Sequence, residues 1–312
     1  MPTIDSPIDR RAFVAAMAAV PLLSLPRFAF AQGQVDAGSY NMRELRGGGA
    51  VPLIGIGTAR LYQDPQTEED YAPLRATIAR FVELGGKVID TAPSYGRAEE
   101  VLGRLIAELG VRDRLYLATK VGVDDREEGV AQIEQAFRNL QTDHIDLIAV
   151  HNLRDIDNQL AILRELQQGG RIGAVGITTS FKPQYEAFEA VMQREALDAI
   201  QIDYALDNRS AAERILPLAQ DKGIAVMINL PFGRGRLFEA TRDLPLPDWA
   251  AEIDTQSWAQ LFLKYIISHP SRPIAIPGTD KVAYVDDNLG AARGVLPDAD
   301  LRRRMERFID EL

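Results

Sequence analysis

The chain alternates short apolar runs with amphipathic stretches, and this alternation limits its possible folds more than any other feature. The apolar runs contain few polar residues, which is typical of parallel strands covered on both faces. The stretches between them carry apolar residues at i, i+3, i+4 and i+7, the pattern of a helix with one buried face. The predicted strands are 53–58, 87–90, 114–120, 145–150, 173–177, 199–202, 224–229 and 273–276. The predicted helices are 71–84, a helix from Arg97, 127–140, 156–168, 183–194, 211–222, 255–268 and a last stretch that ends at Leu312.

Eight strand–helix units in one chain predict an α/β fold of the (β/α)8 TIM barrel type. Residues 42–45, a glycine turn at 47–49 and the first predicted strand indicate an N-terminal hairpin that runs into the barrel. An open doubly wound sheet is the alternative, but no GxGxxG motif follows an early strand as that fold would favour. We expect one barrel domain over residues 32–312.

The composition excludes several kinds of partner and site. The 312 residues carry a formal net charge of −10, which argues against nucleic acid and anionic membrane surfaces as partners. The absence of cysteine excludes disulfides, a thiol nucleophile and thiolate metal ligands. The three histidines, His144, His151 and His269, lie in separate segments, so we expect no metal site.

The first 31 residues have the order of an export signal rather than of a folded element. The pair Arg10-Arg11 precedes an alanine-rich apolar run to Leu25, and an A-x-A cleavage pattern ends at Ala31. The alternative is an uncleaved membrane anchor, but prolines interrupt the run before it reaches the roughly 20 apolar residues of a span. The paired arginines resemble a twin-arginine signal. We expect recognition by export machinery, a periplasmic or exported protein, and no stable membrane anchor after cleavage.

Four ionisable residues lie at or just beyond the ends of three successive predicted strands. They are Asp90, Tyr95, Lys120 and His151. In a β/α barrel the carboxyl ends of the strands form one rim, where catalytic groups gather. Neighbouring parallel strands lie about 4.8 Å apart, so these side chains can converge. Each residue alone has an ordinary explanation, such as a turn cap or packing, but four on one rim predict a site.

These residues, together with several motifs, resemble the aldo-keto reductases from about Leu53 to Asn288. The motifs are GIGTA, DTAPSYG, LATK, VHN, QIDY, PFGRGRLF and IPGT, with an asparagine beyond the last. The four rim residues match the catalytic tetrad of that family in identity, order and spacing. The resemblance implies that the protein reduces an aldehyde or ketone, or oxidises the corresponding alcohol, by hydride transfer with a nicotinamide cofactor.

The residue types of the tetrad suit this chemistry. Tyr95 would be the general acid for reduction and the base for oxidation, with a phenol pKa of about 10 when free. The ammonium of Lys120 would lower that pKa, and Asp90 would hold the lysine charged and in place. His151 would hydrogen-bond the carbonyl oxygen. The hydride must come from the cofactor, because no side chain supplies one.

The resemblance also assigns the cofactor site, which would take NADP(H), with NAD(H) as the alternative. Gln201 would hold the carboxamide, Tyr204 would stack on the nicotinamide, and Asn288 would contact the adenine. Two adjacent threonines stand where many relatives have Ser-Asn, and Lys281 is the remaining cation near the expected 2′-phosphate. The implied cofactor residues are Thr58, Asp90, Thr178, Thr179, Gln201, Tyr204, Pro231, Phe232, Gly233, Arg234, Thr279, Lys281 and Asn288.

The substrate itself is not defined by the sequence beyond a small carbonyl or alcohol. Leu61, Tyr62, Trp249 and Trp258 are the residues expected to frame it. The segment 230–254 is predicted to be a long loop, and loops of that length in a compact domain usually have a function. A non-catalytic redox-sensing or regulatory subunit on the same barrel is the alternative to an enzyme.

Overall fold

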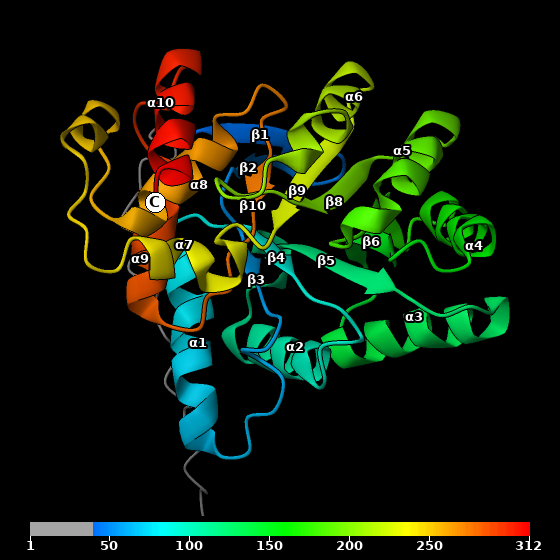
Figure 1. The fold of residues 1–312 in the computed structure, drawn as a ribbon. Coiled ribbons are helices and arrows are strands. Elements are labelled where there is room, and N and C mark those ends of the chain that lie inside the picture. Colours follow the sequence, from blue (N-terminus) through cyan, green and yellow to red (C-terminus); the bar gives the residue numbers. More distant parts are fainter. Residues whose placement is uncertain (1–39) are drawn as a thin grey trace, which may run out of the picture. The chain divides into compact units, whose positions relative to one another are not determined.

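The computed structural model describes residues 40–312, so the predicted export signal at 1–31 lies outside the described residues. Its centre is a parallel sheet of eight strands in the order β10-β9-β8-β7-β6-β5-β4-β3 (Figure 1). Bridges between Ile54 and Ala275 and between Gly57 and Gly278 join the first and last strands. The sheet therefore closes, and the predicted (β/α)8 barrel is confirmed. The strands are β3 (Ile56–Gly57), β4 (Val88–Asp90), β5 (Tyr116–Val121), β6 (Ile145–His151), β7 (Ile172–Thr178), β8 (Ala199–Asp203), β9 (Ala225–Asn229) and β10 (Ile274–Ala275).

Helices alternate with these strands and surround the barrel (Figure 1). The helix α1 begins earlier than its apolar pattern indicates, because Thr67 and Asp70 form a capping box in which each side chain accepts from the other's backbone N–H. The helices are α1 (Glu68–Glu83), α2 (Ala98–Leu109), α3 (Arg126–Leu140), α4 (Ile156–Gln168), α5 (Tyr185–Arg194), α6 (Ile215–Asp221), α7 (Arg236–Ala240), α8 (Trp258–Ile267), α9 (Val282–Gly290) and α10 (Ala299–Asp310). No helix within residues 40–312 is long and apolar enough to cross a membrane.

An N-terminal hairpin is present as predicted, with β1 (Met42–Leu45) as its first strand, but its second strand is β2 (Gly49–Pro52) rather than the first barrel strand predicted at 53–58. Its side chains and carbonyls contact residues at the amino-terminal starts of the barrel strands. Arg43 donates to the carbonyl of Ile224 just before β9, and Lys87 just before β4 donates to the carbonyl of Ala50. The hairpin therefore covers the end of the barrel that is opposite to the rim carrying the predicted site.

The last predicted helical stretch and the predicted long loop both differ from the observed elements. The last helical stretch is two helices, α9 and α10, and Asp298 caps the second by accepting from the N–H of Leu301. The predicted loop at 230–254 contains short helical turns at Gly233–Gly235 and Asp248–Ile253 as well as α7. Such short elements cannot be predicted from an apolar period, because one or two turns are too short to show a 3.6-residue repeat. The glycine and proline residues of this segment favour the prediction of a loop.

Candidate active site

The four predicted rim residues all lie at the carboxyl end of the barrel. Asp90 is the last residue of β4, His151 is the last residue of β6, and Lys120 is the penultimate residue of β5 between them. The parallel register sets Asp90 beside Ala118 and Lys120 beside Ala149. Tyr95 follows in the loop before α2, held by a backbone hydrogen bond of 3.0 Å from its N–H to the carbonyl of Ala92.

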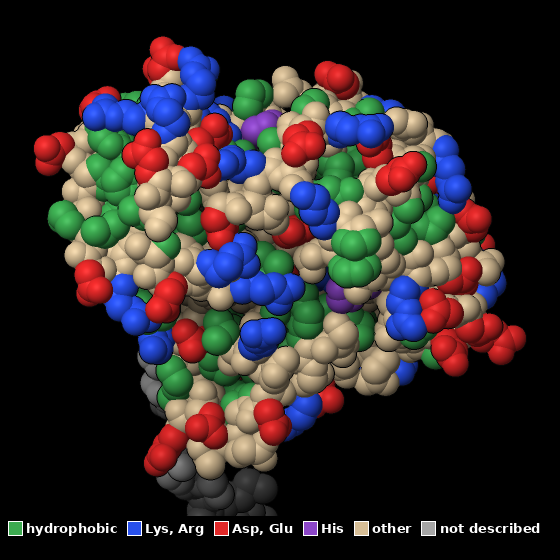
Figure 2. All heavy atoms as spheres, viewed as in Figure 1, with side chains coloured by type: hydrophobic (Ala, Val, Ile, Leu, Met, Phe, Trp, Pro, Cys, Tyr) green, Lys and Arg blue, Asp and Glu red, His purple; other side chains and the backbone are tan. Residues whose placement is uncertain are grey.

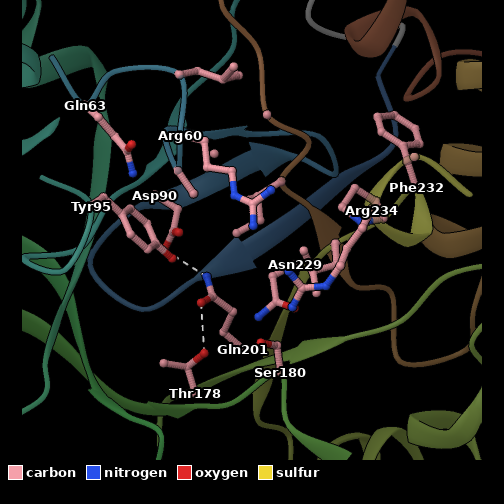
Figure 3. A pocket seen from close by; sticks show the side chains of 18 of the residues that line it. Arg60, Gln63, Asp90, Tyr95, Thr178, Ser180, Gln201, Asn229, Phe232 and Arg234 are labelled. Carbon is pink, nitrogen blue, oxygen red and sulfur yellow. Dashed lines mark hydrogen bonds between the residues drawn. The ribbon is translucent and has the colours of Figure 1, made fainter.

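A buried ion pair forms the base of the site. The Lys120 ammonium donates to both carboxylate oxygens of Asp90 at 2.8 Å and to the carbonyl of Thr91 at 2.7 Å. Gln201 donates to Asp90 Oδ1 at 2.8 Å, and its own Oε1 accepts from the Thr178 hydroxyl at 2.9 Å (Figure 3). The side chains of Lys120 and Asp90 are 1% and 6% exposed, so removal of either partner would leave a buried charge uncompensated.

Tyr95 and His151 complete the group on the cavity side of this pair. The Lys120 ammonium lies 5.1 Å from the centre of the Tyr95 ring. The rings of Tyr95 and His151 meet edge to face, with their centres 6.4 Å apart. The structure therefore brings together all four residues of the predicted tetrad.

The pKa of Tyr95 differs in direction from the sequence-based prediction. The charge of Lys120 is the largest single influence and lowers this pKa, as expected, but burial and the charge of Asp90 raise it, and the result is a pKa above 10.0. The phenol is therefore fully protonated at neutral pH. Burial, with the charges of Lys120 and Arg154, lowers the pKa of His151 to about 4, so its imidazole is neutral there.

A cavity of about 670 Å³ opens above the tetrad. Its size lies in the range of small-molecule sites. Figure 2 shows the hollow near the centre of this face, with Lys and Arg side chains gathered around it. Its polar lining residues are Arg60, Gln63, Asp90, Tyr95, His151, Thr178, Ser180, Gln201, Asn229 and Arg234.

Several of the predicted cofactor residues line this cavity and others lie behind its wall. Those on the wall are Asp90, Thr178, Gln201, Pro231, Phe232 and Arg234. Thr58 is buried and donates to the carbonyl of Asp90, while Thr179 donates to Gln184. Asn288 donates to the buried hydroxyl of Thr279, next to the cavity residue Gly278. Gly233 is buried, and the exposed Lys281 ammonium lies 5.2 Å from the Tyr284 ring centre.

The prediction that Tyr204 stacks on the nicotinamide is wrong. Tyr204 has no exposed surface, and its ring stacks on Tyr265 with 5.7 Å between centres. Its hydroxyl donates to that of Tyr265 and accepts from Arg302. Tyr204 follows the end of β8, and its side chain points toward α8 and α10, where Tyr265 and Arg302 pack against it.

Of the aromatic and apolar residues expected to frame the substrate, only Leu61 lines the cavity. Tyr62 is fully buried and donates to the carbonyl of Thr279. Trp249 packs edge to face against Phe308, and Trp258 stacks on the same ring. The large aromatic residues of the last third of the chain therefore hold α8 and α10 together.

Sequence reasoning missed Arg60, Gln63, Ser180 and Asn229 as cavity residues. Asn229 could have been predicted from the sequence, because it is a polar residue at the end of an apolar strand, as Asp90 is. Arg60 and Gln63 follow the first strand in a short polar loop on the same rim. Every polar residue at a predicted carboxyl strand end was a candidate by that rule.

The cavity has features that fit a nicotinamide nucleotide. The carbonyl oxygen of the Asn229 side chain is buried without a hydrogen-bond partner within the described part of the chain. Such an orphaned acceptor on a cavity wall fits a ligand with an N–H donor, such as a carboxamide. Arg234 offers guanidinium N–H groups toward a phosphate. Across residues 40–312, no group of acidic and histidine side chains is placed to hold a metal ion.

Comparisons with known proteins agree with this geometry. The chain is 34% identical to aldo-keto reductase YhdN of Bacillus subtilis over 199 residues, which are 59% of each chain. It is 28% identical to methylglyoxal reductase YeaE of Escherichia coli over 268 residues, 83% of this chain and 92% of the relative. The fold matches an aldo/keto reductase from Klebsiella pneumoniae, solved with NADP and acetate, with a TM-score of 0.73 and 26% identity over 86% of this chain and 95% of that one.

The match to a family covers most of the chain. Residues 53–306 match the aldo/keto reductase family. The matched range includes every strand of the barrel and all four rim residues. The chain belongs to the aldo/keto reductase family.

Proposed function

We propose that this protein reduces aldehydes or ketones, and oxidises the corresponding alcohols, with Tyr95 as the general acid and base. The observation that carries this function is the placement of a protonated phenol at the cavity wall, beside a buried Lys120–Asp90 ion pair. The assembled tetrad favours an enzyme over the regulatory alternative. Its proton donor lies on the cavity wall beside the buried ion pair, where it can reach a bound ligand.

Each residue of the tetrad has a separate role in carbonyl reduction. The bound nicotinamide cofactor supplies the hydride. Tyr95 gives its proton to the oxygen as negative charge develops there, and the Lys120 ammonium stabilises the resulting phenolate. Asp90 keeps the ammonium in place through its two hydrogen bonds. His151 is neutral at neutral pH, so it can donate an N–H to the carbonyl oxygen without competing as the acid.

We assign NADP(H) as the cofactor, with NAD(H) as the alternative. Support comes from the Klebsiella pneumoniae relative, which was solved with NADP. Within the cavity, Arg234, Gln201 and Asn229 would hold the phosphates and the carboxamide. Dissociation constants for NADPH and NADH, measured by quenching of tryptophan fluorescence, test the choice.

The function is tested by steady-state turnover on a panel of aldehydes and ketones. Purified protein is expected to oxidise NADPH only when a carbonyl compound is present, and to form the alcohol in equal amount. A protein that binds NADPH but reduces no member of the panel would support the regulatory alternative instead.

We also propose that the protein is exported through its N-terminal segment. The support is the order of Arg10-Arg11, an apolar run and an A-x-A pattern. Replacing both arginines by lysine is expected to leave precursor-sized protein in the cytoplasm, as judged by cell fractionation and immunoblotting. Mature protein outside the cytoplasm in normal yield would contradict the twin-arginine assignment and indicate a general secretory signal.

A further inference from the structure

Two arginines that line the cavity have no side-chain partner among residues 40–312. Among the arginines of residues 40–312, only Arg60, Arg234 and Arg307 have a side chain that makes no hydrogen bond or ion pair within the described chain. The neighbouring Arg236, for comparison, pairs with Asp207 at 2.8 Å. Arg60 and Arg234 both line the cavity that contains Tyr95, whereas Arg307 is on the surface of α10.

The two guanidinium groups reach the cavity from different parts of the barrel rim. Arg60 lies in the loop after β3 and Arg234 in the segment after β9, and both side chains extend into the hollow in Figure 3. Both residues have a left-handed backbone, with φ of 67° and 59°. That conformation is unfavourable for a residue with a side chain, and it persists where the surrounding structure holds it.

No negative charge on the cavity wall balances these two cations. Within the part of the chain that the structure describes, Asp90 is the only acidic residue that lines the cavity, and its carboxylate is already paired with Lys120. Two like charges that face one void repel each other, although both side chains are exposed and solvent and salt moderate the repulsion. An anion placed between them would remove the repulsion and gain charge-assisted hydrogen bonds from both.

We propose that Arg60 and Arg234 together form an anion site in this cavity, which takes phosphate or carboxylate oxygens. The inference rests on the proposed function for the identity of the ligand. Two molecules bound there could carry the anion: the nucleotide, through its diphosphate, or the carbonyl substrate, through a charged group of its own. In either case Arg60 is a binding residue that the tetrad and its motifs do not include.

The site is tested first without turnover. Nucleotide-free protein is titrated with inorganic pyrophosphate by calorimetry, using Arg60→Met, Arg234→Met, the double variant and Arg307→Met as the matched control. Each cavity variant is expected to weaken binding about 10- to 100-fold, the size of a lost charge-assisted contact. The double variant should lose less than the sum of the two, because both arginines hold one anion. Unchanged binding in Arg60→Met, or strictly additive losses, would overturn the proposal.

A second pair of measurements distinguishes the two sources of the anion. If the nucleotide supplies it, Arg60→Met weakens NADPH binding and lowers kcat/KM equally for 4-formylbenzoate and its methyl ester. If the substrate supplies it, NADPH binding is unchanged and only the charged aldehyde loses kcat/KM. A variant that changes neither quantity contradicts the site even if pyrophosphate binds. Failure of the wild type to reduce either aldehyde would instead count against the proposed function, and it would leave the pyrophosphate result standing.

Discussion

The phenol of Tyr95 is held between two opposing electrostatic influences. Lys120 favours the phenolate, while burial and Asp90 favour the protonated form that reduction requires. Replacing Tyr95 by Phe removes the proton donor and keeps the ring. We expect kcat to fall by about 10²–10⁴, the usual contribution of a general acid, with little change in the dissociation constant for NADPH. Wild-type turnover in this variant would remove Tyr95 from the mechanism.

Asn229 allows a prediction in which stability and binding change in opposite directions. Its side-chain oxygen is buried without a partner within residues 40–312. Replacing it by Leu, which has the same branched arrangement of side-chain heavy atoms, removes an unsatisfied group, so the protein should be as stable or more stable in urea where the larger methyl groups fit. NADPH binding should weaken about three- to tenfold if the ligand satisfies this oxygen. A variant that loses stability and keeps its affinity would show that Asn229 has a purely structural role.

The sequence could identify the tetrad because its four residues occupy strand ends and a loop whose positions the barrel determines. It failed for Tyr204, because the direction of a side chain just after a strand depends on what packs behind it, here Tyr265 and Arg302. It also failed for Arg60, because nothing in a short polar loop shows whether a cation will find a partner. Whether a charged side chain forms an ion pair depends on which residues the folded chain brings next to it.

At the scale of elements, α2 and α3 approach each other closely at Gly103. A Cβ at this position would overlap the backbone carbonyl of Asn139 and the backbone of Leu140. Gly→Ala inside an exposed helix stabilises by about 0.5–1 kcal/mol, but overlap with backbone atoms costs about 1–3 kcal/mol. We therefore expect Gly103→Ala to lower the free energy of unfolding, measured in urea.

The control for this prediction is Gly169→Ala at the end of α4. A Cβ there would have no atom nearer than 3.5 Å, and the residue has an ordinary right-handed backbone. This variant should be neutral or slightly stabilising. If Gly103→Ala behaves in the same way, the helices can move apart and the close approach does not constrain the barrel.

The apolar period predicted the long helices and missed the caps and short turns. The range 156–168 is the observed α4, since one stripe of apolar residues runs its whole length. In contrast, the predicted helix 211–222 divides into a turn at Ser210–Ala212 and α6, with a distorted backbone at Arg214. An interruption of this kind arises from local backbone geometry, which cannot be predicted from the pattern of apolar residues.

At the scale of the whole molecule, two half-buried histidines are expected to make stability depend on pH. The pKa of His151 and that of His269 are each lowered to about 4, first by burial and then by nearby Lys120 and Arg302. In the unfolded chain both titrate near pH 6.5. Between these values the unfolded chain binds protons that the folded chain does not, so stability present above pH 6.5 is lost as pH falls toward 4.

The contribution of one histidine can be isolated. His269 lies away from the cavity and bonds Ser271 through its Nδ1. His269→Gln should therefore lose less stability than the wild type between pH 7.5 and pH 5, whatever its stability at pH 7.5. Parallel curves of unfolding free energy against pH for the two proteins would show that this imidazole does not contribute to the acid sensitivity.

The location proposed for the protein imposes a further requirement on the whole molecule. An exported reductase works away from the soluble nicotinamide pool of the cytoplasm, so it must carry its cofactor and keep it between turnovers. It would then oxidise one substrate and reduce another at the same site. Retention over many turnovers requires a very slow dissociation rate, and therefore tight binding.

The two-arginine anion site offers a physical basis for such retention if the diphosphate fills it. Arg234 lies in the segment after β9, and Arg60 lies in the loop after β3, so an anion bound by both would tie two loops across the cavity. We expect protein isolated from the periplasm to carry close to one nucleotide per chain, more NADP(H) than NAD(H), as measured by mass spectrometry after denaturation. Arg60→Met should arrive with a smaller share. Dialysed wild-type protein that is empty, and that turns over only with excess NADPH, would contradict retention while leaving the reductase activity intact, because the tetrad acts on whatever cofactor the cavity holds.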